Sequence, residues 1–171
     1  MKKRSAALAA VSLVLAAVFL AAQERSGDRG ETAEARRLKG RSMEPKAADI
    51  DSSVTLDAML KKGEKDLTAQ KAVKVERYVV QEEKEAEDGD IHVVLAPSKG
   101  ESDTRKWVIT EVPASWQKKK SSLSLASIRK LHGTKVSVTG WLYWEPDPDQ
   151  PDPRGTRWEI HPVTEIAPAN K

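Results

Sequence analysis

Hydrophobic and polar residues alternate along most of the chain after residue 70, with the period of two that is typical of half-buried strands. Val73, Val75 and Val79, for example, are separated by polar or aromatic residues. Pro97 and Pro113 end two of these runs, because proline cannot continue a strand ladder. The alternation predicts five strands, over residues 71–81, 90–96, 106–112, 136–144 and 156–166.

Two short segments change to helical spacing. Thr55 is a typical helix cap, Leu56, Met59 and Leu60 then share one face, and Gly63 is a typical stop signal. Ser124 is a cap of the same kind, before an apolar stripe at 125, 128 and 131 and the stop at Gly133. We expect one short helix before the strands and one between the third and fourth.

The predicted order, strand, strand, strand, helix, strand, strand, is that of a five-stranded OB-type Greek-key barrel. Gly140 interrupts the fourth strand where a long strand of such a barrel bends or bulges. We therefore predict a mainly β fold of this type with a short N-terminal helix. Residues 54–168 form the predicted domain, and 169–171 are a tail.

Three segments resemble exported bacterial OB-fold domains of uncharacterised function. They are Asp88-Gly89-Asp90-Ile91-His92, Val138-Thr139-Gly140-Trp141 and the ten residues from Arg154 to Val163. The resemblance covers roughly residues 54–167. It implies the fold and an exported location, and it implies no activity.

Composition excludes several kinds of chemistry. The 171 residues contain no cysteine, which removes disulfides, thiolate metal sites, cysteine nucleophiles and a lipidated N-terminal cysteine. The formal net charge is +3, but Lys2, Lys3 and Arg4 account for it. Because the remaining chain is balanced, its charge gives little support to nucleic acid binding.

The N-terminus has the layout of a secretory signal: a basic start, an apolar run over residues 6–22 and then polar residues. We expect removal of residues 1–22 by cleavage after Ala22, and a periplasmic or secreted protein. The alternative is an uncleaved leader, which would be the only contact with a membrane. Residues 23–53 are rich in charge of both signs and poor in large apolar residues, so we expect a disordered linker.

Two carboxylate and histidine pairs are the candidate metal ligands. Asp90 with His92, and Glu159 with His161, are each two residues apart, and such side chains point to the same face of a strand. If the two faces met, their oxygen and nitrogen atoms would suit zinc, manganese or iron. The alternative is that each histidine hydrogen-bonds a carboxylate or a backbone group and has a structural role.

The aromatic residues suggest a binding surface. The chain has five tryptophans against one phenylalanine and two tyrosines. Trp141 and Tyr143 lie on the opposite side of their strand from Val138 and Leu142, so they face outward if the latter face the core. OB barrels stack ligands on such rings. The alternative is that the two rings cover an edge of the sheet or pack under the first helix.

We expect a binding module of the cell envelope, not an enzyme, with no cofactor and with an envelope protein or a small ligand as partner. The first alternative is a metal-binding protein or metal-dependent hydrolase with a divalent ion at the four candidate ligands. A nuclease would draw on Asp90, Glu111, Arg77 and Arg157, although no specific spacing supports it. Single-stranded nucleic acid binding is a further alternative, by analogy of fold alone.

Overall fold

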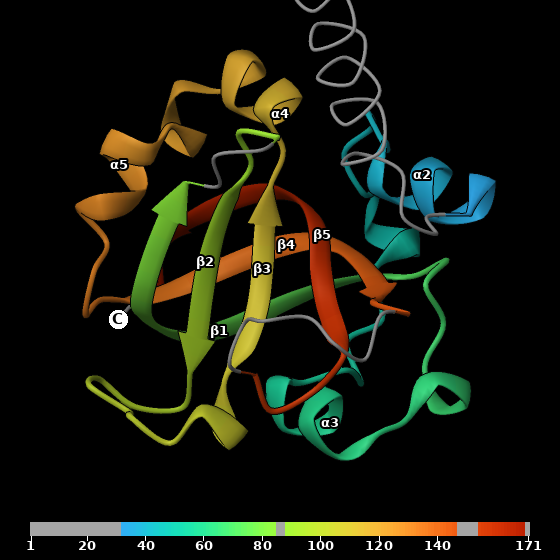
Figure 1. The fold of residues 1–171 in the computed structure, drawn as a ribbon, viewed down its shortest axis with the longest axis horizontal. Coiled ribbons are helices and arrows are strands. Elements are labelled where there is room, and N and C mark those ends of the chain that lie inside the picture. Colours follow the sequence, from blue (N-terminus) through green and yellow to red (C-terminus); the bar gives the residue numbers. More distant parts are fainter. Residues whose placement is uncertain (1–31, 85–87, 147–153, 170–171) are drawn as a thin grey trace, which may run out of the picture. The chain divides into compact units, whose positions relative to one another are not determined.

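The computed structural model describes residues 32–84, 88–146 and 154–169 (Figure 1). The predicted leader and residues 23–31 of the predicted linker lie outside this part. The chain divides into two units, residues 1–36 and 37–171. Of the first unit only residues 32–36 are described, and helix α2 starts within them, at Ala33. Among the described residues, no helix has the length and apolar character needed to span a membrane.

Five strands form one closed barrel in the order β1-β2-β3-β5-β4. Neighbouring strands are antiparallel, except for β3 and β5, which are parallel. This topology confirms the predicted OB-type barrel. The strands are β1 (Ala72–Lys84), β2 (Ile91–Ala96), β3 (Val108–Val112), β4 (Lys135–Trp144) and β5 (Trp158–Pro168).

The interior of the barrel is filled by apolar residues that mostly alternate along its strands, with a break where the β4 and β5 register shifts. Successive side chains of a strand point to opposite faces, so the apolar half of each alternating pattern meets at the barrel axis. These residues include Val73, Val75 and Val79 on β1, Ile91, Val93 and Leu95 on β2, Val108 and Val112 on β3, Val136, Val138 and Leu142 on β4, and Trp158, Ile160, Val163 and Ile166 on β5.

Gly140 is the bend that the sequence predicts. The register between β4 and β5 shifts on both sides of it. A Cβ atom at this position would lie 2.5 Å from Ile160 Cγ2 and 2.6 Å from the backbone oxygen of Pro162. Glycine is therefore required here because β5 approaches the β4 backbone too closely for a side chain.

The helices are short and lie outside the barrel. Thr55 caps α3 (Leu56–Lys61) by accepting a hydrogen bond from Ala58 N–H, and Ser124 caps α5 (Leu125–Arg129) in the same way. Both helices agree with the sequence pattern. The other helices among the described residues are α2 (Ala33–Lys39), α4 (Ala114–Lys119) and the 3-10 turns Ala47–Asp49, Glu64–Asp66, Thr104–Lys106 and Ser121–Leu123.

Helix α4 is absent from the sequence prediction. It starts directly after Pro113, and its only buried residue is Trp116, so it has no apolar stripe to reveal it. Lys118 and Lys119 lie in the last turn of this helix. The third strand also starts later than predicted, because Lys106 belongs to the 3-10 turn Thr104–Lys106 and β3 starts at Val108.

The structure differs from the linker expectation over residues 37–53. These residues carry the end of α2, a 3-10 turn and a bridge from Ile50 to Ala72 of β1. Their contacts with the barrel are hydrogen bonds and ion pairs more than apolar packing, which is why low hydrophobicity gave no sign of order.

Candidate functional site

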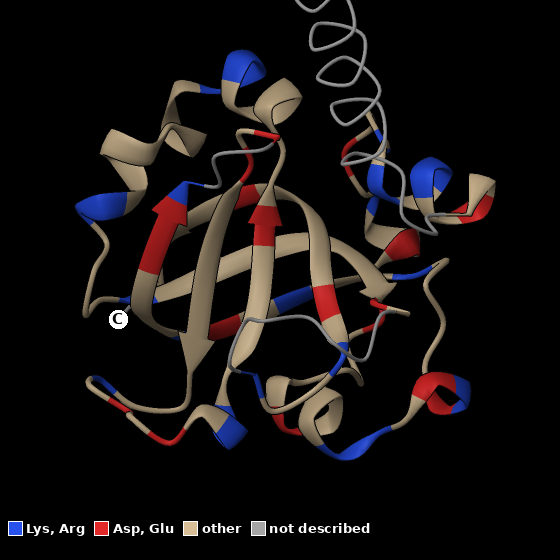
Figure 2. Ribbon diagram, viewed as in Figure 1, with Lys and Arg blue, Asp and Glu red and all other residues tan. Residues whose placement is uncertain are grey.

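The outward positions of β2, β3 and β5 carry a cluster of acidic and histidine side chains. His92 is the outward residue between Ile91 and Val93, and Glu111 precedes the interior residue Val112. Glu159 and His161 flank the interior residue Ile160 on β5. Figure 2 shows acidic segments on β3 and on β5, which pair side by side in the barrel. The same alternation that fills the core therefore builds a polar outer face.

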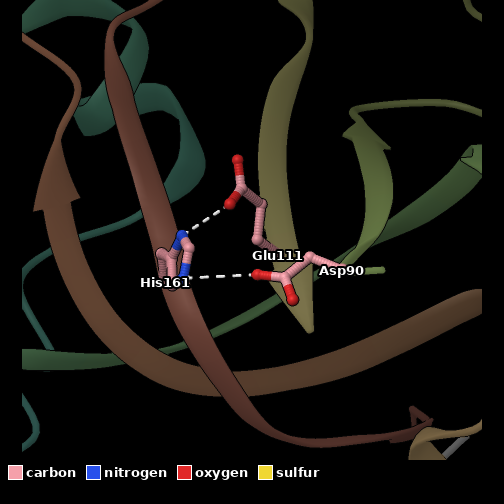
Figure 3. Close-up of side chains that lie close together, drawn as sticks. All are labelled: Asp90, Glu111 and His161. Atoms are coloured by element: carbon pink, nitrogen blue, oxygen red, sulfur yellow. Dashed lines mark ion pairs between the residues drawn. The ribbon is translucent and has the colours of Figure 1, made fainter. Parts of the chain in front are cut away.

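Asp90, Glu111 and His161 converge at the centre of this face (Figure 3). His161 Nδ1 lies 2.6 Å from Glu111 Oε2, and His161 Nε2 lies 3.9 Å from Asp90 Oδ2. One ligand atom from each of the three residues lies within 4.8 Å of the other two. The side chains are 13%, 9% and 4% exposed for Asp90, Glu111 and His161. The cluster is thus nearly closed, with Asp90 at its most open side.

The loop before β2 fixes the position of Asp90. Its Oδ1 accepts a hydrogen bond of 2.9 Å from the backbone N–H of Ala114, at the start of α4. Its own backbone N–H donates to Asp88 Oδ1, which closes a tight turn with Gly89 at positive φ. One carboxylate oxygen is therefore held, while the other faces His161.

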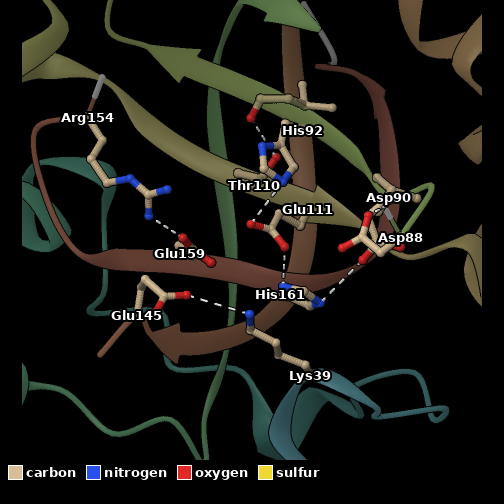
Figure 4. A network of polar contacts seen from close by, with 12 residues as sticks. Lys39, Asp88, Asp90, His92, Thr110, Glu111, Glu145, Arg154, Glu159 and His161 are labelled. Atoms are coloured by element: carbon tan, nitrogen blue, oxygen red, sulfur yellow. Dashed lines mark hydrogen bonds and ion pairs between the residues drawn. The ribbon is translucent and has the colours of Figure 1, made fainter. Parts of the chain in front are cut away.

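Glu111 joins the two histidines of the sequence prediction. His92 Nε2 lies 3.2 Å from Glu111 Oε1, on the side of the carboxylate opposite His161 (Figure 4). His92 and Glu111 are opposite each other in the β2 and β3 register. A carboxylate with both oxygens engaged has little freedom to rotate, so Glu111 is presented to His161 in a fixed orientation.

Burial and charge move the pKa values of the two carboxylates in opposite directions. Burial raises the pKa of Asp90, and its hydrogen bond from Ala114 offsets this only in part. Burial would also raise the pKa of Glu111, but the charge and hydrogen bond of His161, followed by the charge of His92, outweigh it. The pKa of Glu111 is consequently lowered to about 2, so this residue is a carboxylate throughout the physiological range.

Glu159 has a different environment on the same face. Its side chain is 1% exposed, and its Oε1 is paired with Arg154 Nη1. Its Oε2 is buried and has no hydrogen-bond partner among the described residues. Burial first, and then the charge of Glu111, raise the pKa of Glu159 well above its ordinary value despite the arginine. The direction follows because a second buried negative charge so near Glu111 is unfavourable.

Lys39 approaches the cluster from the end of α2. Its Nζ lies 3.6 Å from Glu145 Oε2 and 5.0 Å from the centre of the Tyr143 ring. Burial would lower the pKa of Lys39, but attraction to Tyr143 and to the surrounding carboxylates outweighs it, and the pKa is raised. The ring of Tyr143 also contacts the ring of His161 edge to face.

The arrangement allows two chemical states. Without a metal, the imidazole of His161 contacts the carboxylates of Asp90 and Glu111. With a divalent ion, two carboxylates and a neutral imidazole provide three hard or borderline ligands and cancel its charge. When ligand atoms bind one ion at about 2.1 Å, they lie roughly 3 to 3.5 Å from one another. Small side-chain movements would therefore bring the ligand atoms of Asp90, Glu111 and His161 into range of a single ion.

The structure brings together only part of the predicted ligand set. Asp90 and His161 meet, whereas His92 contacts Glu111 and Glu159 pairs with Arg154. Sequence reasoning placed Glu111 only among the residue types of a nuclease and missed its position between the histidines. The sequence did contain one sign of this role, because Glu111 is the single charged residue in the segment Val108–Val112.

Trp141 and Tyr143 lie on the outer face of β4, opposite the interior residues Val138 and Leu142. Residues of the chain's own N-terminal side cover them. Arg41 lies over the Trp141 ring at 4.5 Å, and Lys39 lies over Tyr143, which is almost fully buried. Their predicted role as ligand-stacking residues stays a prediction.

No family model and no curated protein matches this chain. Solved structures share parts of its fold. Asparaginyl-tRNA synthetase of Entamoeba histolytica is 17% identical with a TM-score of 0.42, over 61% of this chain and 22% of that one. A putative aspartyl-tRNA synthetase from Leishmania major is 14% identical with a TM-score of 0.42, over 75% and 22%.

A third structure, of yeast Stn1 and Ten1, is 17% identical with a TM-score of 0.35, over 58% of this chain and 43% of that one. The chain therefore spans about a fifth of the length of the synthetases and less than half of the yeast protein. Likeness at this level carries no inference about ligand or activity. The functional conclusion rests on the site itself.

Proposed function

We propose that this protein binds a divalent transition-metal ion through Asp90, Glu111 and His161. The convergence of their three ligand atoms within 4.8 Å, from the loop before β2 and from strands β3 and β5, supports the proposal. Two oxygens and one imidazole nitrogen suit zinc, manganese or ferrous iron. The chain has no cysteine, so no thiolate competes with these ligands for the ion.

The surroundings also support binding. The hydrogen bond from Ala114 orients Asp90, and His92 orients Glu111, which is the kind of support that holds metal ligands in place. The pKa of Glu159 is raised, which disfavours its charged form. This limits the repulsion between Glu159 and the carboxylate of Glu111 when no ion is bound. Three protein ligands leave a further position for water or a ligand of the ion.

Single-stranded nucleic acid binding is favoured less by this geometry. The outer face of β3 and β5 presents carboxylates, which repel a phosphate backbone. An envelope-binding role and export remain expectations from the sequence, and they are compatible with metal binding.

Equilibrium dialysis with zinc, followed by elemental analysis, tests the proposal on the full chain. We expect about one zinc per chain at about 100 μM free ion. Asp90→Asn keeps the size and the hydrogen bond from Ala114 but removes the charge, so it should weaken binding at least about tenfold. Asp57→Asn, on the exposed face of α3, is the matched control and should bind as the wild type does.

Two results would overturn the proposal. One is a wild-type chain that retains no zinc under these conditions. The other is zinc bound equally well by the wild type and by Asp90→Asn. His132 forms an exposed pair with Glu82, which could itself bind zinc, so His132→Ala is a further control. If this variant loses zinc and Asp90→Asn does not, the ion binds at His132 and not at the proposed site.

A further inference from the structure

A short segment of the chain, residues 39–44, lies against the outer side of α4 and β4 without forming a helix or strand beyond the end of α2. Side chains of the barrel bind its backbone. Trp116 Nε1 donates to Arg41 O at 2.9 Å, Lys119 Nζ donates to Ser42 O at 2.7 Å, and Trp141 Nε1 donates to Met43 O at 3.1 Å. Three successive carbonyls are thus bound by three side chains that are distant in sequence.

The side chains of the middle residues take little part in this contact. Ser42 is exposed, and the Met43 side chain is 73% exposed although its carbonyl is hydrogen-bonded. Main-chain carbonyls are common to every peptide, so this part of the recognition does not depend on sequence.

Charged side chains at both ends of the segment supply the selectivity. Arg41 lies over the Trp141 ring, and Lys39 lies over Tyr143 beside Glu145. Glu44 pairs with Lys120 Nζ at 2.9 Å. Two cations on aromatic faces followed by an acid define the pattern Lys-x-Arg-x-x-Glu.

We propose that this surface, formed by Trp116, Lys119, Lys120, Trp141, Tyr143 and Glu145, is a docking site for an extended peptide of a partner protein that carries two cations followed by an acid. Residues 39–44 occupy it within the chain. A partner peptide with two cations two positions apart takes their place, with its carbonyls on the two indoles and Lys119. The proposal is independent of metal binding.

Charge and chemistry argue for this occupant. The surface offers two aromatic rings and a carboxylate to cations, and two indole N–H groups and the Lys119 ammonium to carbonyls. The Lys120 ammonium is offered to an acid, as its pair with Glu44 shows. An acidic or apolar peptide would lose the contacts made by Lys39 and Arg41. Because the internal segment is attached, it competes at a millimolar effective concentration, and a free peptide binds well only once the segment is released.

The test uses the full chain in the presence of a chelator, so that metal binding does not affect it. Lys39→Glu and Arg41→Glu together should release the internal segment, because they place acids beside Glu145 and on the Trp141 ring. A labelled synthetic peptide of residues 37–46 is the probe, and fluorescence anisotropy is the readout. We expect binding at least about tenfold tighter to the double variant than to the wild type.

Two controls make the result specific. A peptide with glutamate in place of both cations should fail to bind. Adding Trp141→Phe to the double variant removes one N–H donor but keeps a ring, and it should weaken binding about threefold to tenfold. The proposal is overturned if the double variant keeps the amide protection of the barrel and yet binds neither peptide, or binds both equally.

A second experiment covers a double variant that does not fold. A specific protease site inserted between Pro45 and Lys46 of the otherwise wild-type chain allows the segment to be cut loose. We expect the N-terminal fragment to stay bound through gel filtration and to exchange with the labelled peptide. Immediate loss of the fragment overturns the proposal. Concentration-dependent dimers that disappear with excess peptide would assign the surface to a second copy of the chain and overturn the partner assignment.

Discussion

The two faces of β5 differ sharply although they belong to one strand. Trp158, Ile160 and Val163 point into the barrel and pack in an apolar interior. Glu159 and His161 point outward and are equally buried, yet they are surrounded by charge. The interior is explained by the hydrophobic effect alone, since it removes apolar surface from water.

The outer face needs another explanation. Buried ion pairs contribute little net stability, because the cost of removing charges from water offsets their attraction, and apolar replacements are often equally stable. Net stability alone therefore does not explain a cluster of two histidines and several carboxylates on one covered face. We interpret it as a ligand site, and the predictions below test the contrast with the interior.

The largest effect is expected from Glu111, which joins both histidines. Glu111→Gln should lower the unfolding free energy by about 3 to 5 kcal/mol at pH 7, since it leaves buried imidazoles without their partner. Its folded pKa of about 2 lies below the ordinary value of 4.5. The difference between wild type and variant should thus be full above pH 4.5 and disappear as the pH falls through about 2.

Urea unfolding across this pH range measures the Glu111 difference. Glu165→Gln, an exposed position on the same sheet, is the control and should change stability by less than about 0.5 kcal/mol. A difference between wild type and Glu111→Gln that is constant with pH would contradict the assigned role of the charge.

An interior change should affect stability and leave the outer face intact. Ile160→Ala, between Glu159 and His161, should cost about 2 to 5 kcal/mol because it leaves a cavity. Zinc affinity of the folded variant should equal that of the wild type. If Ile160→Ala weakened zinc binding as much as Asp90→Asn does, the interior and outer faces of β5 would not be independent.

The close approach of β5 to β4 should tolerate no added atom. Gly140→Ala places a Cβ against Ile160 Cγ2 and the Pro162 backbone, and it should cost about 1 to 3 kcal/mol. Thermal unfolding measures the change. Gly100→Ala, where no atom lies within 4 Å but φ is positive, separates the crowding at Gly140 from the general cost of losing a glycine. An equal or larger loss at Gly100 would contradict the packing argument.

Glu159 should show the opposite pH dependence to Glu111. Its pKa is raised in the folded chain, so its contribution to stability is full below pH 4.5 and is lost as the pH rises. The unfolding free energy of the wild type relative to Glu159→Gln should therefore fall above pH 4.5, by at most about 1.4 kcal/mol per pH unit. A relative stability that rises with pH would show that the Arg154 pair dominates.

The sequence predicted what depends on local pattern. Period-two alternation located the five strands, Gly140 marked the bulge, and Thr55 and Ser124 marked their helix starts, because each signal lies within a few residues. The site was predictable only in part. Asp90 and His161 were found by residue type, but their meeting at Glu111 depends on the pairing of β3 with β5, which no local pattern encodes.

Residues 37–53 are ordered in a way that their own sequence did not predict. Their composition predicted disorder, since they contain few apolar residues to bury. Their order comes from donors elsewhere in the chain, such as Trp116 and Trp141, which bind backbone carbonyls. Backbone carbonyls are the same in every residue, so the segment's own sequence contains no sign of this contact.

The most direct measurement is anomalous diffraction at the zinc absorption edge from crystals of the full chain grown with zinc. Metal binding at the outer face predicts one strong peak within bonding distance of Asp90, Glu111 and His161, and a clearly weaker peak at this place in Asp90→Asn. A map in which these side chains keep their contacts with one another, with zinc absent or bound only at His132 and Glu82, would contradict metal binding at the outer face.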